Sequence, residues 1–317
     1  MLDPDDRGRR AITAGRIPLR GGARGERSRA IGAVAALLVL AWTVAPSASR
    51  AQEVTTTPYA GIVHLHRRIP NQEVHVVRIE LGRPEVSVVA TRPDAGRTRT
   101  SAFARAAGAV VAINANWFGH NPCGLAVGEG QIWPGFQRHC DASLGFGGGR
   151  AEAFDSQRIW RGPPPRPWMT EVITGKPWLV KQGRSQHPWR IPTRMGARAP
   201  RTAAGLTRDD RTLILLVADG RAPHVSGLTG QELAAMMIEL GAWNAINLDG
   251  GGSSTLFIDA EGGVVNRNRG FRERIVGNHL GIRFRGRQPG PRTAEETRAL
   301  QRDERQRRRD ERASPAP

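Results

Sequence analysis

Three consecutive glycines between an aspartate and two serines constrain this chain more than any other feature. The segment reads Asn247-Leu248-Asp249-Gly250-Gly251-Gly252-Ser253-Ser254. Glycine tolerates positive φ and lets a ligand approach the backbone, while a run of three costs ordering entropy. Apolar residues 243–248 lead into the run, and residues 255–258 leave it as a second strand. We expect a strand-end loop that presents a carboxylate, amides and hydroxyls; the alternative is a tight turn between paired strands.

A second predicted strand also ends in a carboxylate followed by glycine. Residues 213–218 are continuously apolar, which predicts a strand buried on both faces, and Asp219-Gly220-Arg221 follows. The segment between this strand and the glycine run has the apolar spacing of a helix. Because a strand–helix–strand crossover normally joins parallel neighbours, we expect Asp219 and Asp249 on the same edge of one sheet.

The helix between these strands has local signals at both ends. Thr229 with Glu232 three residues later predicts a capping box. Gly241 predicts a left-handed C-terminal cap. The apolar positions recur at helical spacing and predict the buried face: Leu233, Met236, Met237 and Leu240. The two methionines are therefore core residues.

The remaining periodicity predicts an α/β (α+β) fold, a single domain over residues 52–284 with a mixed β-sheet core and a few helices. Strands are expected over residues 73–79, 86–90 and 109–113, with a hairpin over 124–132 and a short helix over 103–107. This length is ample for one hydrophobic core.

The two ends of the chain differ from this domain. Residues 31–44 are apolar, follow basic residues and precede small residues near position 51, as in a secretory signal peptide; an uncleaved anchor is the alternative. Residues 285–317 are charged and poor in large apolar side chains, which predicts a disordered tail. We expect an exported protein, periplasmic or extracellular, with no integral membrane association after cleavage of the leader (residues 1–51).

The formal net charge of +18 raises the question of an anionic partner. About half of it lies in the two ends, and the domain has no basic stripe interleaved with aromatic residues. We therefore expect no nucleic-acid partner. A positive domain does attract phosphorylated or anionic glycans.

Two cysteines, Cys123 and Cys140, lie in a stretch rich in loop residues. In an exported protein such a pair predicts a disulfide. A metal site that adds His120 and His139 is the alternative, but it lacks any recognised zinc spacing.

Several segments that resemble known motifs follow one another between residues 109 and 283. They are Ala112-Ile113-Asn114-Ala115-Asn116-Trp117-Phe118, the hairpin 124–132, Pro200-Arg201-Thr202-Ala203-Ala204-Gly205, Asp219-Gly220-Arg221, Ser226-Gly227-Leu228-Thr229, the glycine run, and Arg274-Ile275-Val276-Gly277-Asn278-His279-Leu280. This series resembles the phosphodiester glycosidase family. The resemblance implies a hydrolase that cleaves a sugar-1-phosphodiester, similar to an N-acetylglucosamine-1-phosphodiester. A non-catalytic binder of anionic envelope polysaccharide is the alternative.

Two carboxylates are the catalytic candidates, because glycosidases handle an oxocarbenium-like transition state with aspartate or glutamate. Asp249 is the first choice and Asp219 the second, and which would be acid and which base stays open. Either carboxylate offers oxygen ligands to Ca²⁺ or Mg²⁺. For Asp219, a turn residue that caps its own backbone is the alternative.

The diester's negative charge calls for cationic partners. Arg201 and Arg221 are predicted to clamp the phosphate, since the guanidinium fork matches phosphate oxygens. The other predicted substrate-binding residues lie in the same segments: Asn114, Thr202, Asn247, Gly250, Gly251, Gly252, Ser253, Ser254, Arg274 and Asn278.

Overall fold

The structure is a computed structural model that describes residues 51–135, 140, 142–156, 166–187, 192–267 and 272–286. The predicted leader and tail therefore lie almost wholly outside the described residues. No helix within these ranges is both long and apolar enough to cross a membrane.

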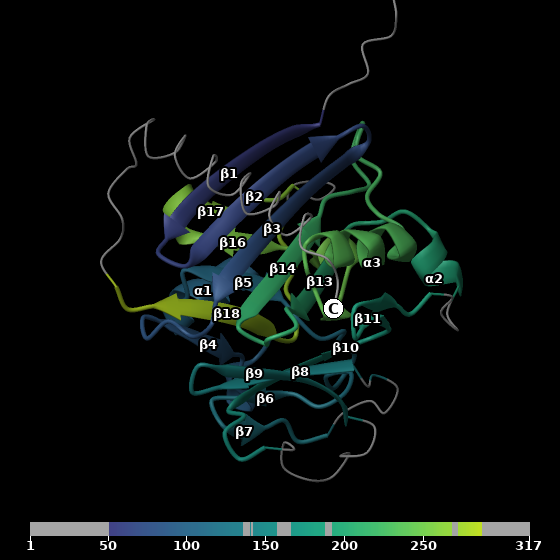
Figure 1. The fold of residues 1–317 in the computed structure, drawn as a ribbon. Coiled ribbons are helices and arrows are strands. Elements are labelled where there is room, and N and C mark those ends of the chain that lie inside the picture. Colours follow the sequence, from purple (N-terminus) through teal and green to yellow (C-terminus); the bar gives the residue numbers. More distant parts are fainter. Residues whose placement is uncertain are drawn as a thin grey trace, which may run out of the picture. The chain divides into compact units, whose positions relative to one another are not determined.

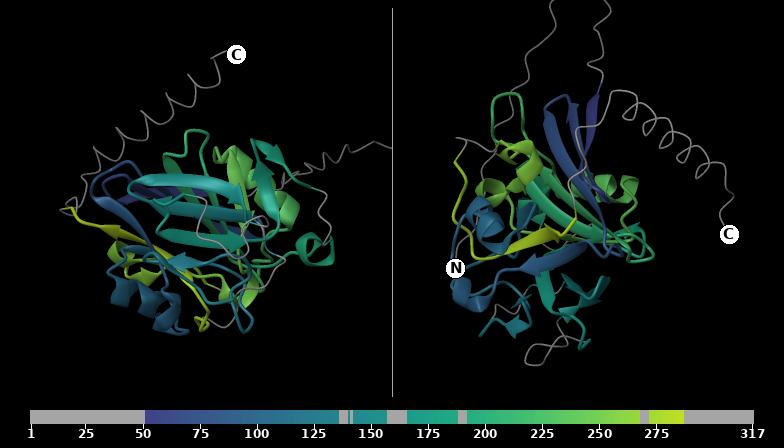
Figure 2. Two further views of the ribbon diagram at one scale, coloured as in Figure 1. Left: turned by 90° about the horizontal axis from the view of Figure 1, so that it is seen from below. Right: turned by 90° about the vertical axis from the view of Figure 1, so that its left-hand side faces the viewer.

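Within the described residues, eighteen strands form three sheets. Figures 1 and 2 show how these strands are arranged. The largest has the order β1 (Gln52–Tyr59), β2 (Ile62–Ile69), β3 (Gln72–Glu80), β14 (Thr212–Ala218), β13 (Arg201–Leu206), β15 (Asn244–Asn247), β11 (Trp178–Lys181) and β12 (Arg184–Ser185). A second has the order β17 (Gly263–Val264), β16 (Leu256–Ile258), β5 (Val111–Asn114), β18 (His279–Phe284) and β4 (Val86–Ala90). The third has the order β7 (Gln131–Ile132), β6 (Val127–Gly128), β10 (Glu171–Gly175), β8 (Ala142–Gly147) and β9 (Arg150–Asp155).

The helices in the described part of the chain are short and few. They are α1 (Thr100–Ala107), α2 (Pro192–Gly196) and α3 (Gly230–Glu239), with 3₁₀ turns at Pro93–Ala95, Gly251–Ser253 and Asp259–Glu261. Sheets with helices packed on their outer faces make the single α+β domain that the sequence predicts.

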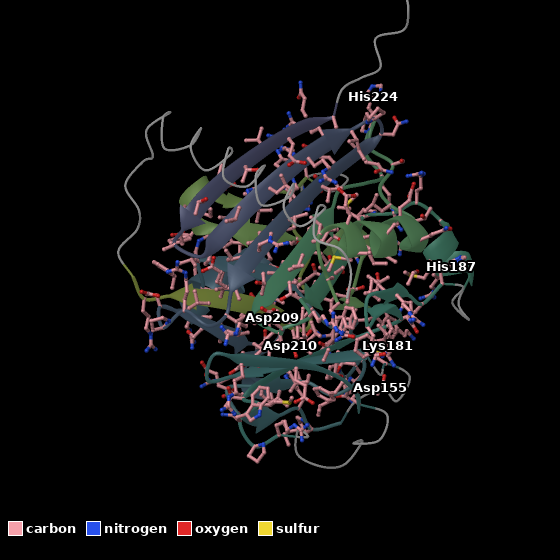
Figure 3. The ribbon with its side chains drawn as sticks, viewed as in Figure 1. Asp155, Lys181, His187, Asp209, Asp210 and His224 are labelled. Carbon is pink, nitrogen blue, oxygen red and sulfur yellow. A yellow bond between two sulfur atoms is a disulfide. The ribbon has the colours of Figure 1, made fainter. Side chains whose placement is uncertain are left out.

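Alternation along β14 shows where the core lies. Leu213, Leu215 and Val217 point into a cluster that all three sheets share, while Ile214 and Leu216 pack in a second cluster with α3. The predicted burial of this strand on both faces is confirmed. A polar contact also joins two of the sheets, because Lys181 Nζ of β11 lies 2.9 Å from Asp155 Oδ2 of β9 (Figure 3).

The local signals of α3 are confirmed. The Glu232 amide donates to Thr229 Oγ1 at 3.2 Å, and the Thr229 amide donates to Glu232 Oε2 at 2.9 Å. Leu233 and Met237 are fully buried, and Gly241 has a φ of 90° just beyond the helix.

The predicted parallel neighbours are wrong. β13 lies between β14 and β15 and pairs antiparallel with both, with Arg201 opposite Ala218 and Ala203 opposite Asn247. The hairpin formed by β13 and β14 occupies the edge that a parallel neighbour would need. β14 and β15 are nevertheless parallel to each other, so Asp219 and Asp249 do follow strand ends on the same edge of the sheet. The two strands are two strand spacings apart, or about 10 Å.

Candidate active site

Asn114, at the end of β5, holds the glycine loop in place. Its amide donates to the Asp249 carbonyl at 2.6 Å. Its oxygen accepts from the Thr202 hydroxyl and from the Thr255 amide, each at 3.0 Å. Asn114 and Thr202 are fully buried. Both residues therefore connect β5 and β13 to the two ends of the loop instead of facing solvent.

Asp249 lies at the start of this loop and is half-buried. Burial raises the pKa of its carboxyl, and the Ser253 hydroxyl, the positive charge of Arg274 and the Gly250 amide oppose that rise. Arg274 Nη1 in turn lies 3.5 Å from Ser253 Oγ. Groups of the loop itself and Arg274 thus stabilise the ionised carboxylate, which remains partly accessible to solvent.

Two arginines lie over the glycines. Gly251 has a φ of 65°, and a Cβ added there would lie 3.2 Å from Arg221 Nη1. A Cβ on Gly252 would lie 2.7 Å from Arg274 Nη2. Arg221 and Arg274 are both exposed. The absence of side chains on the loop lets two guanidinium groups approach its backbone and gather positive charge near Asp249.

The loop amides are partly used within the protein. The Gly251 amide donates to the Pro200 carbonyl at 2.8 Å, and the Ser254 amide donates to the Gly251 carbonyl at 3.2 Å. Ser253 and Ser254 are buried. The exposed guanidinium groups are therefore better placed to meet an anion than the loop amides are.

Arg201 has a different environment from Arg221 and Arg274. It is buried, and its guanidinium donates to the carbonyls of Leu228, Arg194 and Ala197 at 3.0, 2.8 and 2.7 Å. Burial, and secondarily the charge of Arg221, lower the pKa of Arg201. Its donors connect β13 to the segments beside α2 and α3, so the structure gives it a positioning role.

Asp219 is also buried, with 1% of its surface exposed. Its carboxylate accepts from the Arg267 amide at 2.8 and 2.9 Å and from Asn266 Nδ2 at 3.0 Å. Burial, opposed by these hydrogen bonds, raises the pKa of Asp219 to about 6. The sequence analysis missed Asn266, because it follows a two-residue strand and belongs to no motif.

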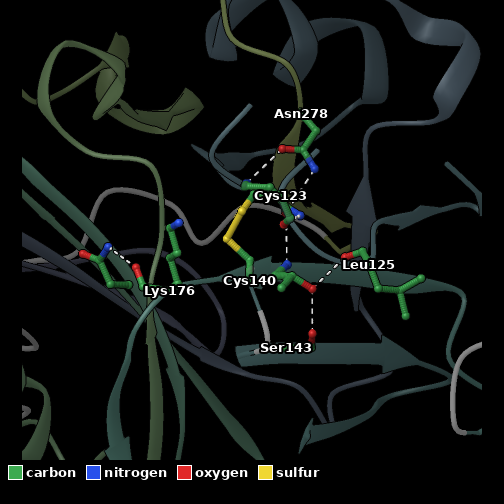
Figure 4. The surroundings of a disulfide bond; sticks show 9 residues. Cys123, Leu125, Cys140, Ser143, Lys176 and Asn278 are labelled. Atoms are coloured by element: carbon green, nitrogen blue, oxygen red, sulfur yellow. Dashed lines mark hydrogen bonds between the residues drawn. A yellow bond between two sulfur atoms is a disulfide. The ribbon is translucent and has the colours of Figure 1, made fainter. Parts of the chain in front are cut away.

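Asn247 and Asn278 make their contacts within the protein. Asn247 Nδ2 donates to the Lys176 carbonyl at 2.7 Å. Asn278 Oδ1 accepts from the Asn116 amide at 2.9 Å, and its amide group donates to Asn116 Oδ1 at 3.1 Å. These side chains fix β15 and the loop after β5 (Figure 4).

The predicted disulfide is confirmed. Cys123 and Cys140 are bonded, with their Cα atoms 5.4 Å apart. The Cys123 carbonyl accepts from Asn116 Nδ2 at 3.0 Å, so the bridge and Asn278 restrain the same loop (Figure 4).

One group of side chains in the described part of the chain could hold a metal ion, and the sequence analysis missed it. It consists of His66, Glu73 and His75, whose ligand atoms lie within 4.8 Å of one another. His75 Nε2 lies 3.9 Å from Asp219 Oδ2, which places the group beside Asp219. Only the pairing of β2 with β3 brings these residues together, so no motif along the sequence reveals them.

Comparison with known proteins relates these segments to a family. Residues 107–283 match the model of the phosphodiester glycosidase family. The SPbeta prophage-derived uncharacterized protein YomE of Bacillus subtilis (strain 168) is 28% identical over 187 residues, which are 55% of this chain and 28% of that protein. The chain therefore matches less than a third of the length of this relative.

Solved structures show the same fold at low identity. A hypothetical protein from Synechocystis gives a TM-score of 0.60 at 18% identity, over 74% of this chain and 64% of that one. The catalytic domain of zebrafish N-acetylglucosamine-1-phosphodiester alpha-N-acetylglucosaminidase, auto-inhibited by its pro-peptide, gives 0.53 at 19% identity, over 74% and 83%. A Burkholderia pseudomallei protein described as exported gives 0.51 at 17% identity, over 67% and 74%.

Proposed function

Because the chain belongs to the phosphodiester glycosidase family, whose model matches more than half of it, we propose that it hydrolyses a sugar-1-phosphodiester in a glycan or glycoconjugate. The substrate class proposed is similar to an N-acetylglucosamine-1-phosphodiester, the group named for the zebrafish enzyme of the same fold.

One observation carries this proposal: the partly accessible Asp249 lies in a glycine loop beneath Arg221 and Arg274. A phosphodiester is an anion that guanidinium groups bind in a forked arrangement. The sugar carbon becomes cationic in the transition state, which a carboxylate stabilises. The loop brings both kinds of group to one place.

The chemistry assigns different roles to the two aspartates. Phosphate leaves as a stabilised anion, so its departure needs less help from a general acid than an ordinary sugar leaving group does. Arg221 and Arg274 stabilise that anion, and Asp249 acts at the sugar carbon as base or nucleophile. Its raised pKa makes it a stronger base than a free aspartate. Asp219 positions Asn266 and Arg267 from beneath the surface.

We also propose that the protein works outside the cytoplasm, in the periplasm or beyond the cell. The Cys123–Cys140 disulfide supports this location, because such bonds persist in oxidising compartments. A protein of the same fold is described as exported.

A non-catalytic binder of anionic polysaccharide is the second candidate, because the exposed Arg221 and Arg274 would serve binding alone equally well. A substrate panel separates the two. The purified protein is offered a chromogenic N-acetylglucosamine-1-phosphodiester, the matching neutral glycoside and the matching phosphate monoester. Turnover of the diester alone supports the hydrolase. Binding of the phosphorylated sugars without turnover of any of them would support the binder and contradict the hydrolase.

A further inference from the structure

Three histidines form a stack between the eight-stranded sheet and the turn that joins β16 to β17. His64 and His66 lie on β2, and His75 lies directly opposite His66 on β3. The ring centroids of His66 and His75 are 4.2 Å apart, and those of His64 and His75 are 5.3 Å apart. His66 Nε2 lies 2.8 Å from Glu73 Oε1 on the same face of β3. Four titratable side chains thus share one small region.

A chain of hydrogen bonds fixes the tautomer of each inner ring. His64 Nδ1 lies 2.8 and 2.9 Å from the two carboxylate oxygens of Glu261, and an ionised carboxylate only accepts. His64 therefore donates from Nδ1 and, when neutral, accepts at Nε2. His75 Nδ1, 3.1 Å from His64 Nε2, must then be the donor. This leaves a lone pair on His75 Nε2.

That lone pair faces another acceptor. His75 is 3% exposed, and its Nε2 has no hydrogen-bond partner among the described residues. Asp219 Oδ2 lies 3.9 Å away and is buried as well. Two buried acceptors that face each other are unfavourable unless a proton or another cation lies between them. A cation bound at His75 Nε2 would satisfy this lone pair and offset the negative charge of Asp219.

The donor set selects the kind of cation. Two imidazoles and one carboxylate suit zinc and similar transition metals, whereas calcium and magnesium prefer oxygen ligands alone. The Glu261–His64 pair supplies the outer hydrogen bonds that orient a metal-bound imidazole. The side chains of His66 and Glu73 are 21% and 19% exposed, so an ion can enter from the surface.

We propose that His66, Glu73 and His75 form a zinc-type metal site on β2 and β3, beside Asp219 at the end of β14. His66 Nε2 and Glu73 Oε1 exchange their mutual hydrogen bond for the metal, and the ring proton of His66 moves from Nε2 to Nδ1 through solvent, so that the neutral imidazole binds through Nε2. Arg68, which also contacts Glu73 Oε1 at 3.0 Å, is largely exposed and can turn outward. The family match begins at residue 107, so all three ligands lie outside it. The site does not depend on the proposed hydrolase activity.

The test measures metal binding directly. Protein that carries no polyhistidine tag is stripped with chelator and titrated with Zn²⁺ by calorimetry, and the bound metal is measured by mass spectrometry. Co²⁺ is then used as a spectroscopic probe, since ligand-field bands report four-coordinate nitrogen and oxygen ligation. We expect one tight equivalent of zinc and a higher melting temperature with zinc than without it.

Variants assign the ligands. His66→Ala removes a partly exposed ligand and should abolish tight binding while the protein stays folded. Glu261→Gln replaces the ionised acceptor of His64 Nδ1 with a neutral amide and should weaken zinc affinity by about 10–100-fold. His120→Ala alters an exposed histidine far along the sequence and should bind as the unaltered protein does. The proposal is overturned if the unaltered protein takes up no zinc, or if His66→Ala binds it as tightly.

Discussion

The glycine loop and the histidine stack lie near the same edge of the eight-stranded sheet, and they differ in accessibility and in the charge of the ligand that they suit. In the loop, Asp249 is partly accessible, and two exposed arginines lie over residues without side chains. In the stack, Asp219 is buried and faces the imidazole of His75. The first arrangement leaves cations and a carboxylate open to a large anionic substrate. The second excludes such a substrate and suits a single small cation. Two aspartates with the same Asp-Gly sequence context therefore differ in role because of what the fold packs around them.

The largest expected effect separates the two aspartates. Asp249→Asn keeps the size of the side chain but removes the base, so kcat on the sugar phosphodiester should fall by about 10³-fold. Circular dichroism and the melting temperature serve as the control for folding. An Asp249→Asn variant with near-normal kcat would assign the chemistry to another group.

Removal of the disulfide should lower the stability of the protein and affect the glycine-loop site, but not the histidine stack. Cys123→Ser with Cys140→Ser opens a loop closed by residues 17 apart, which should cost about 3 kcal/mol of unfolding free energy. Because the bridge restrains the loop after β5, KM should also rise, while zinc uptake should not change. Denaturant unfolding and kinetics measure the two parts. Unchanged stability would show that the Asn116–Asn278 hydrogen bonds hold this loop without help from the disulfide.

Arg274→Ala should affect both binding and pH dependence. Loss of one guanidinium should lower kcat/KM by about 10–100-fold, the range for a charge-assisted hydrogen bond. The positive charge of Arg274 lowers the pKa of Asp249, so its removal raises that pKa further. Because the base must be ionised, the acidic limb of the kcat/KM profile should move to higher pH. Arg272→Ala, an exposed neighbour, is the matched control. A limb that moves to lower pH would contradict the contact.

The smallest effect is expected at Asp219. Asp219→Asn retains one oxygen that can accept from the Arg267 amide, so kcat should change by less than about tenfold and stability should fall by about 1–2 kcal/mol. Comparison of the two kcat values, for Asp219→Asn and Asp249→Asn, tests whether the two aspartates have different roles. A loss of kcat as large as that of Asp249→Asn would restore Asp219 to the chemistry as a second catalytic carboxylate.

Local signals explain most of what the sequence could predict. The capping box of Thr229 and Glu232, the alternation in β14 and the Cys123–Cys140 pair each depend on residues close in sequence or on one simple pairing rule. The insertion of β13 between β14 and β15 depends on which strand edge is already occupied, which no periodicity records.

The candidate site shows the same limit. The contiguous glycine run placed Asp249 in a loop at a strand end, as expected. Arg201 looked equivalent to Arg221 in the sequence, yet carbonyls from residues 194, 197 and 228 engage its guanidinium. His64, His66 and His75 are separated by ordinary strand residues, and only the register of β2 with β3 stacks them.

The central claim is that the glycine loop breaks the bond between the sugar carbon and the phosphate oxygen. Hydrolysis of either bond to that oxygen gives the same two products, so the source of the oxygen must be traced. The reaction is run in ¹⁸O-labelled water, and the released phosphate monoester is weighed by mass spectrometry. We predict a phosphate product without ¹⁸O, because water attacks the sugar carbon and the bridging oxygen leaves with phosphorus. A phosphate product that carries ¹⁸O would show attack at phosphorus and would contradict the glycosidase account.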